Sequence, residues 1–336
     1  MLVVAACSSS SESKAPRAIS VVRAELLGYV EDVKAATGYR YRATDDHGHT
    51  MDTAKIIETG ETGELAAVYH WWDESINGFR VSLATSSNLL DWKWRVNLGD
   101  HVSQPTIKAA SDGGYVVAYD SDIGLHLKFA YFRTWDDLLH AKAAKAFDAE
   151  RQLPGCAEGT ANLYTASSTR VEFGLHFFAG CESDRQARGT TDWTSWTASE
   201  QLLLNRAALL QGYHGSIGDR DVINFEGHEF TFLEAQFVQS DWRTFRVLLY
   251  DEGTGAADRA SFPNPSPLPP SVHVLIRTHA GSYAFTNLTV SEVHIDGHSA
   301  LVVGVFIPSE GAQGDEAGEL IYYRLLDKSD EVPRPA

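Results

Sequence analysis

Acidic side chains are concentrated in residues 214–236, a stretch with the pattern of a β-hairpin. Two apolar-rich runs meet at Glu226-Gly227, and glycine supplies the positive φ that a tight hairpin turn needs. Counting back from this turn places Asp219 opposite Glu234. Directly opposed residues of an antiparallel pair project on the same side of the sheet, with Cβ atoms about 4.5–5.5 Å apart. The pattern therefore predicts two carboxyl groups in close proximity.

Arg220 and Asp221 belong to the same acidic group. Two neighbouring carboxylates repel each other unless a cation, a shared proton or Arg220 intervenes. Such groups often mark functional sites, so the cluster indicates a surface that faces a ligand or substrate. The alternative is a frayed strand end at which both acids meet water.

The hairpin pattern recurs along the chain, and this recurrence predicts the fold. A polar lead-in, a short apolar strand, a turn and a second strand also occur in residues 51–71, 103–120, 157–178 and 285–306. A repeat of about 50 to 65 residues with three or more strands per unit is typical of a propeller. We therefore expect an all-β fold, a five-bladed β-propeller, formed by residues 19–336 as one domain. The inner strands should contain Thr53, Thr106, Thr160, Val222 and Asn287, and residues 19–41 could supply the outer strand that closes the ring.

The polar lead-ins should converge, because the inner strands of a propeller run along one central axis. A second hairpin count places His70 roughly opposite Asp52, with Trp71 and Trp72 next along the chain. Carboxylates accept hydrogen bonds from hydroxyl groups, and aromatic faces cover the C–H surfaces of sugars. The predicted funnel therefore suits a neutral carbohydrate. Its candidate catalytic residues are Asp52, Glu158, Asp219 and Asp221, and its candidate substrate-binding residues are His70, Trp71, Trp72, Gln104, Arg220, Glu234 and Asn287.

Paired carboxyl groups also have a catalytic use, since two of them at a suitable separation can hydrolyse a glycosidic bond. A calcium ion held by Asp219, Asp221 or Glu234 is an alternative, because hard oxygen ligands are concentrated there. No C-x-x-C pair occurs, and we expect no resident zinc. Apart from that calcium ion, no cofactor is expected.

These features resemble the five-bladed glycoside hydrolases of family 43 and their relatives. The resemblance rests on the acids that open the inner strands and on the stretch TSSNLLDW (85–92), and it extends over residues 52–326. It implies that Asp52 is the base and that Glu158, in the stretch AEGT, is the acid. Gln104 departs from the family pattern, which has an aspartate before the proline at this position. Glutamine cannot titrate, so the means of setting the pKa of the acid is missing or has moved to the Asp219–Asp221 group.

Three functions are consistent with this pattern. The first is a glycoside hydrolase acting on a neutral oligo- or polysaccharide in the funnel. The second is a non-catalytic glycan-binding protein, which Gln104 favours. The third is a structural propeller that presents a face to a protein partner.

Charge and the first residues bear on location and partners. The chain has 28 basic and 45 acidic residues, a formal net charge of −17, which repels nucleic acid and anionic lipid. Val4-Ala5-Ala6-Cys7 resembles the lipobox of bacterial lipoproteins, although no basic segment precedes it. Residues 1–18 are thus expected to be a signal remnant and a Ser-rich tether, with Cys7 lipidated and the protein exported. Contact with the membrane would then be through the lipid anchor alone, and the alternative is a chance cysteine in a tail.

The two remaining cysteines fit an exported protein. A hairpin count about Ser168-Thr169 places Cys156 opposite Cys181, just beyond the strand ends, where a disulfide is geometrically possible. The alternative is a pair of small buried thiols. We expect the bridge.

Overall fold

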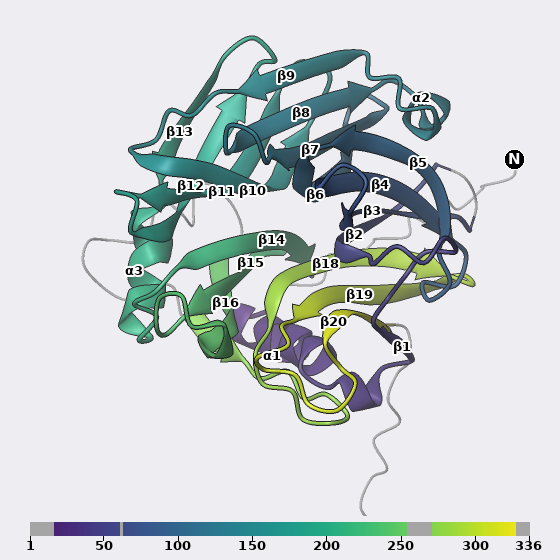
Figure 1. The fold of residues 1–336 in the computed structure, drawn as a ribbon. Coiled ribbons are helices and arrows are strands. Elements are labelled where there is room, and N and C mark those ends of the chain that lie inside the picture. The colour runs from purple at the N-terminus through teal and green to yellow at the C-terminus, as the bar shows by residue number, and fades with distance from the viewer. Residues whose placement is uncertain (1–16, 61–62, 254–270, 327–336) are drawn as a thin grey trace, which may run out of the picture.

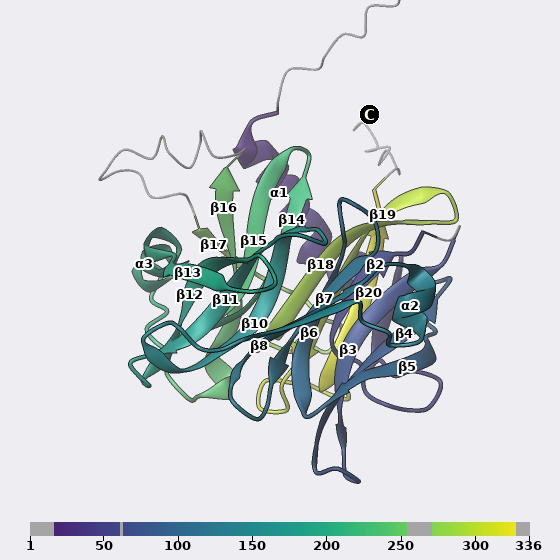
Figure 2. The same ribbon diagram turned by 90° about the horizontal axis from the view of Figure 1, so that it is seen from above.

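The structure is a computed structural model that describes residues 17–60, 63–253 and 271–326. Five antiparallel sheets of four strands each are arranged in a ring, and the innermost strand of every sheet faces the common axis (Figure 1). The predicted five-bladed β-propeller is therefore confirmed. The side view in Figure 2 shows the blades of the ring packed face to face.

Each blade is a meander that runs outward from the axis. Blade one contains β2 (Asp52–Glu58), β3 (Leu65–Asp73), β4 (Gly78–Ser86) and β5 (Lys93–Asp100). Blade two contains β6 (Val102–Ala109), β7 (Tyr115–Ser121), β8 (His126–Phe132) and β9 (Lys145–Ala149). Blade three contains β10 (Gly155–Ala166), β11 (Val171–Ala179), β12 (Ser183–Thr191) and β13 (Trp196–Glu200). Blade four contains β14 (Ile217–Phe225), β15 (His228–Gln236), β16 (Phe245–Gly253) and β17 (Ser271–Val274). Blade five contains β18 (Thr286–Ile295), β19 (His298–Ile307), β20 (Gly318–Leu325) and β1 (Gly38–Tyr41).

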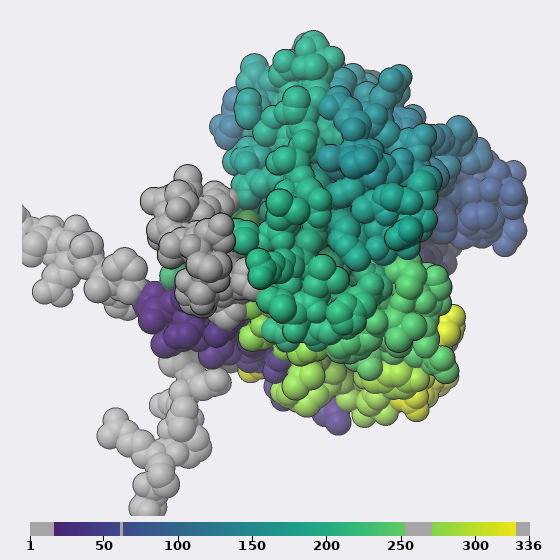
Figure 3. Space-filling model, turned by 90° about the vertical axis from the view of Figure 1, so that its left-hand side faces the viewer, coloured from purple at the N-terminus to yellow at the C-terminus, as the bar shows by residue number. Residues whose placement is uncertain are grey.

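The ring is closed by the start of the chain, as the sequence suggested. Strand β1 pairs antiparallel with β20, so one blade combines both ends of the domain. The segment before β1 is a helix, α1 (Ile19–Val30), followed by the 3-10 turn η1 (Val33–Ala35). Val22, Leu26 and Val30 of α1 are fully buried against apolar residues of blades four and five. Figure 3 shows this purple helix against the green and yellow-green atoms of those blades.

Shorter helices lie at the edges of the blades. Helix α2 (Trp135–Leu139) follows β8, and α3 (Leu202–Leu210) follows β13. The 3-10 turn η2 (Trp242–Thr244) connects β15 to β16. No helix among the described residues is long and apolar enough to cross a membrane.

Large aromatic residues fill the space between neighbouring blades. Trp193 and Trp196 are buried in the cluster that joins blades two and three, and Trp92 is buried between blades one and five. Buried aromatic rings supply a large share of the apolar contact area of a core. The tryptophans that follow the third strands are thus packing residues.

The most important backbone feature for the site is a bulge at the start of every inner strand. The register of the inner pair shifts there in each blade, once in four of them and repeatedly in blade three. In four blades the bulged residue is not glycine but has positive φ: Thr53 (58°), Gln104 (49°), Thr160 (40°) and Asn287 (52°). A bulge re-aims a side chain and leaves an amide outside the ladder. The chain repeats this arrangement around the axis, which turns polar side chains and free amides toward one mouth.

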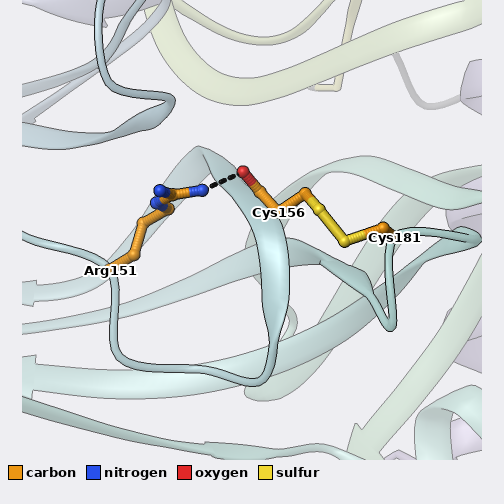
Figure 4. The surroundings of a disulfide bond; sticks show 3 residues. All are labelled: Arg151, Cys156 and Cys181. Carbon is orange, nitrogen blue, oxygen red and sulfur yellow. Dashed lines mark hydrogen bonds between the residues drawn. A yellow bond between two sulfur atoms is a disulfide. The ribbon is translucent and has the colours of Figure 1, made fainter.

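The predicted disulfide is present in blade three. Cys156 and Cys181 are bridged with their Cα atoms 5.2 Å apart. The register slips between Gly155 and Thr165, but Cys156, near the start of β10, still meets Cys181, which follows the end of β11. The Arg151 guanidinium donates to the carbonyl oxygen of Cys156 beside the bridge (Figure 4).

Removing this bridge should lower the free energy of unfolding. For a loop closed by 25 residues of separation, the chain-entropy model gives a loss of about 3 kcal/mol. The double variant Cys156→Ser/Cys181→Ser should show this loss in urea denaturation, and a reductant should destabilise the parent but not the variant. Equal sensitivity of the two proteins to reductant would contradict the bridge.

Candidate active site

A cavity of about 520 Å³ opens at the mouth where the five bulges lie. Its lining contains no lysine or arginine, and carboxyl, amide and aromatic groups predominate. The carboxyl groups are those of Asp52, Asp184, Asp219 and Glu234; the amides are those of Gln104, Gln236, Gln239 and Asn287; the aromatic rings are those of Phe79, Trp242, Phe245 and Phe306.

Hydrogen bonds join three bulged residues beside the cavity, and two of them, Gln104 and Asn287, line it. The Thr53 hydroxyl donates to Gln104 Oε1 at 2.8 Å, and the Asn287 side-chain amide donates to the same oxygen at 3.0 Å. Asn287 Nδ2 also lies 2.9 Å from the Thr53 hydroxyl. Gln104 is therefore fixed by side chains from blades one and five, and its neutral amide acts as a structural tie.

The amides freed by the bulges are bound by side chains of the preceding blade. His70 Nδ1 accepts from the amide of Gln104 at 3.3 Å, Asp120 accepts from that of Thr160 at 2.8 and 3.0 Å, and Glu234 accepts from that of Asn287 at 2.9 Å. Glu319 closes the ring by accepting from the amide of Thr53 at 3.3 Å. A buried amide without a partner would cost about 1–3 kcal/mol, so these polar side chains hold neighbouring blades together.

Asp52 lies at one side of the cavity, paired with His70 as the hairpin count predicted. Burial raises the pKa of Asp52 to about 6, although its hydrogen bond from the Thr50 hydroxyl acts in the opposite direction. Burial lowers the pKa of His70 to about 4, so this imidazole is neutral and can accept the Gln104 amide. A carboxyl group of this kind exchanges its proton close to neutral pH, which suits acid–base work.

Asp219 lies at the other side of the cavity, next to a half-buried histidine. His176 Nδ1 is 3.4 Å from Asp219 Oδ1, and His176 Nε2 is 3.8 Å from Asp184 Oδ1. Burial alone would lower the pKa of His176, but the charges of Asp184, Asp219 and Asp120 outweigh it and raise the pKa to about 10. A positive imidazole therefore lies beside the Asp219 carboxylate at neutral pH.

Two further carboxyl groups, those of Glu234 and Asp120, interact with this pair. Burial, together with the negative charge of Asp219, raises the pKa of Glu234 well above its usual range. Burial also raises the pKa of Asp120, although His176 acts against it. Glu234 and Asp120 therefore keep their protons to a higher pH than free carboxyl groups do.

Stability should depend on pH through His176. Its pKa is higher in the folded state than its ordinary value of 6.5, so its contribution is complete below about pH 6.5 and is lost as the pH rises toward 10. The facing groups Asp184, Asp219 and Asp120 supply this effect. We expect His176→Gln to lower the melting temperature at pH 6 and to approach the parent at pH 10, as followed by thermal melts across this range. The exposed His140, changed to Gln, is the control, and a constant difference between His176→Gln and the parent would refute the linkage.

Several of the predicted site residues therefore share one cavity. Asp52, His70, Gln104, Asp219, Glu234 and Asn287 all line it. The predicted opposition of Asp219 and Glu234 is altered by the bulge, because the register shifts between Ile217 and Arg220. The two remain neighbours, because both the charge and the backbone amide of Asp219 act on the Glu234 carboxyl group.

Glu158 lies outside the cavity lining. One carboxylate oxygen accepts from the backbone amides of Gln152 and Leu153 at 2.8 and 2.6 Å. The other oxygen is buried. This arrangement ties the loop before β10 to the blade.

Asp221 and Arg220 are also directed elsewhere. Asp221 points to the opposite mouth, where it binds Lys55 Nζ at 2.6 Å and the amide of Val290 at 2.8 Å. The side chain of Arg220 is completely buried between blades three and four, with Gln186 and Tyr164 among its partners. Neither side chain lines the cavity that contains Asp52.

The two tryptophans predicted to bind substrate have different environments. Trp71 stacks on His49 at 3.8 Å between ring centroids and donates to the Ser82 hydroxyl, so it packs within the blade. Trp72 is exposed and contacts Phe79 edge-on at 5.1 Å. Phe79 lines the cavity, which places Trp72 at its rim.

Sequence reasoning missed Asp120 and His176, which lie on the second strands of blades two and three. In three second strands a polar residue follows a buried or half-buried apolar one: Tyr69-His70, Tyr119-Asp120 and Leu175-His176. Anchoring the repeat on second strands as well as inner ones would have found them. Among the described residues, no group of three or more histidine, cysteine, aspartate or glutamate side chains is placed to hold a metal ion.

Comparison with known proteins identifies the fold. No family model and no curated protein sequence matches the chain. An exo-1,5-α-L-arabinanase from a bovine ruminal metagenomic library superposes with a TM-score of 0.54 at 12% identity, covering 84% of this chain and 96% of that one. An exo-β-1,3-galactanase from Clostridium thermocellum gives 0.52 at 11% identity, covering 85% and 62%. A thermostable family-43 glycoside hydrolase gives 0.50 at 12% identity, covering 85% and 92%. The resemblance to the five-bladed propeller glycoside hydrolases is thus confirmed at the level of the fold.

Proposed function

We propose that the protein is a glycoside hydrolase that accepts a neutral oligo- or polysaccharide in the cavity at the propeller axis. The observation that carries this proposal is the pair of unlike carboxyl groups on the cavity wall. Burial raises the pKa of Asp52 to about 6, whereas Asp219 lies 3.4 Å from a protonated histidine. Hydrolysis of a glycoside needs one carboxylic acid and one carboxylate.

The environments assign the roles. Asp52 is the acid that protonates the leaving-group oxygen, and Asp219 is the carboxylate that acts as base or nucleophile. This replaces the assignment implied by the family resemblance, in which Asp52 is the base and Glu158 the acid. It also fits the fixed position of Gln104, because no aspartate is needed in blade two to adjust a distant Glu158.

The class of substrate follows from the lining. Carboxylates accept hydrogen bonds from hydroxyl groups, amides both accept and donate them, and no lysine or arginine in the lining would attract an anionic sugar. The solved structures with this fold include an arabinanase and a galactanase, which supports a neutral polymer of pentose or hexose units.

A screen of aryl glycosides and of plant and bacterial polysaccharides tests the proposal. We expect release of reducing sugar from at least one neutral substrate, with loss of turnover in Asp52→Asn and Asp219→Asn. Failure of every substrate, together with glycan binding by the parent, would overturn it.

The second candidate is a non-catalytic glycan-binding protein. Two observations favour it: Gln104 occupies the position of a family aspartate, and the Glu158 carboxylate is bound by backbone amides outside the cavity. Calorimetric titration with oligosaccharides distinguishes it from the enzyme, because binding would persist in the Asp52→Asn variant without turnover in the parent.

We also propose export and lipid anchoring, which rest on the lipobox-like stretch alone. Cys7 lies outside the described residues. Labelling with a fatty-acid probe in a bacterial host should mark the parent and not Cys7→Ser. Equal labelling of both proteins would exclude Cys7 as the anchor.

A further inference from the structure

Two of the tryptophans are exposed, and both are at the cavity. The chain has 8 tryptophans, all within the described residues. Trp72 is 44% exposed and Trp242 is 48% exposed, whereas the other six are buried or half-buried. Exposed apolar surface at the mouth of a cavity often marks a ligand-binding groove.

Each exposed indole is supported by a phenylalanine of the cavity wall. Trp72 contacts Phe79 at 5.1 Å between ring centroids, with the planes at 82°, and Phe79 in turn contacts His70 at 5.0 Å. Trp242 contacts Phe245 at 5.2 Å, with the planes at 57°. Phe79 and Phe245 both line the cavity, so the two indoles extend its wall outward.

The two platforms lie across the mouth from each other. Trp72 is near the end of β3 in blade one, and Trp242 is in η2 of blade four. In a ring of five, blades one and four are not neighbours, because blade five separates them on one side and blades two and three on the other. Asp52 is in the same blade as Trp72, and Asp219 is in the same blade as Trp242.

The turn that carries Trp242 is internally fixed. The Asp241 carboxylate accepts from the amide of Arg243 at 3.1 Å, and the Thr244 hydroxyl donates to the carbonyl oxygens of Asp241 and Val238 at 2.7 and 3.1 Å. Little conformational entropy is then lost when a ligand stacks on the indole.

We propose that a neutral polysaccharide chain crosses the mouth from Trp72 to Trp242 and is cleaved internally between them. The inference rests on the proposed hydrolase function. Each indole would cover the C–H face of one sugar, and the carboxyl and amide groups between them would bind the hydroxyls. In the reaction, water adds across the glycosidic bond: the leaving oxygen gains a proton and the anomeric carbon gains a hydroxyl group. One aromatic platform would suffice for a chain end, whereas two on opposite sides provide sugar subsites on both sides of the scissile bond.

The test compares polymer and small substrates. Trp72→Ala and Trp242→Ala should each raise KM for the polysaccharide about tenfold, in keeping with the loss of one aromatic stacking contact. Turnover of an aryl monoglycoside should change less than twofold. The control is Tyr39→Ala, a 46% exposed aromatic on β1 that contacts Tyr41 and His279 and does not line the cavity.

The products provide a second readout. Internal cleavage should lower the viscosity of the polymer solution while few reducing ends have formed, and the first products should be mixed oligosaccharides. Release of a single small sugar from the beginning would overturn internal cleavage, and an unchanged KM in both tryptophan variants would overturn the platforms.

Binding separates this inference from the proposed activity. If the parent hydrolyses nothing, affinity electrophoresis in gels containing the polysaccharides still reports on the platforms. Retardation of the parent and of Tyr39→Ala, but not of the two tryptophan variants, would support the crossing chain while the hydrolase proposal fails. If the gels retard none of the four proteins, or retard all four equally, the proposal of a crossing chain is overturned.

Discussion

Asparagine in place of Asp219 should reduce turnover of every glycoside substrate by about 10³-fold, whatever the leaving group. Asp219 is the carboxylate beside the protonated His176, and asparagine keeps its shape but supplies neither a base nor a nucleophile. Substrates with activated aryl leaving groups need no proton from the enzyme, and they still need this carboxylate. Steady-state kinetics with a dinitrophenyl glycoside and with an unactivated oligosaccharide measure both cases.

Asp52→Asn should behave differently with the two substrates. If Asp52 is the acid, the variant should lose about 10²–10⁴-fold on the oligosaccharide and much less on the activated glycoside. The parent should show a related pH dependence, with kcat/KM falling as the pH rises through about 6, the pKa to which burial raises Asp52. A fall as the pH decreases through the same value would instead make Asp52 the base.

Glu158→Gln distinguishes this assignment from that of the family pattern. Because its carboxylate is bound by the amides of Gln152 and Leu153, we expect the variant to lose stability while its kinetic constants change little. If Glu158→Gln spares only activated substrates and Asp52→Asn loses both, the roles implied by the resemblance hold and ours do not.

The architecture could be predicted because it depends on repetition. Thr53, Thr106, Thr160, Val222 and Asn287 all lie on inner strands, as expected. Each hairpin carries the same alternation of polar lead-in and apolar strand, and such a period is visible even when the copies share few identities. The outer strand β1 was also expected, whereas helix α1 was not, since its apolar residues are not regularly spaced enough to distinguish a helix from a strand.

The direction of individual side chains could not be predicted, because it depends on the bulges. A single inserted residue moves every following side chain to the other face of the strand. Four of the bulged residues are Thr53, Gln104, Thr160 and Asn287. None of them is glycine, so their residue types do not indicate the positive φ. The hairpin count therefore placed Asp52 and His70 correctly but could not show that Glu158 lies outside the cavity lining.

The positions of the acids could be predicted more easily than their roles. Glu234 lines the cavity as expected, but it also holds the amide of Asn287 in the next blade. Asp120 and Glu319 hold bulge amides in the same way. The acids near the propeller axis thus have two roles. Some line the cavity, some bind the bulge amide of the next blade, and only the hydrogen bonds of each carboxylate distinguish these roles.

The hydrogen bonds of the Arg220 guanidinium also join neighbouring blades, and they depend on the room left for this group. Its guanidinium is completely buried and donates to Gln186 Oε1 at 2.9 Å, to Gln201 Oε1 at 2.5 Å and to the Tyr164 hydroxyl. Room for it comes from Gly174 on β11, where an added Cβ would lie 2.6 Å from Arg220 Cζ. The same Cβ would also collide with Asn162 Oδ1, which is buried as well.

Gly174→Ala should therefore lower the free energy of unfolding by about 4 kcal/mol. Overpacking costs about 1–3 kcal/mol, and displacing the guanidinium weakens charged hydrogen bonds worth about 1.5–3 kcal/mol each. Urea denaturation measures the loss. The control is Gly28→Ala in helix α1, where nothing lies within 4 Å of the added Cβ and alanine should stabilise the helix by up to about 1 kcal/mol. Because Arg220 lies on β14 directly after Asp219, kcat of Gly174→Ala should also fall at temperatures where the variant is fully folded. A variant as stable as the parent would show that the guanidinium can move aside, and the buried network would then not be what holds Asp219 in place.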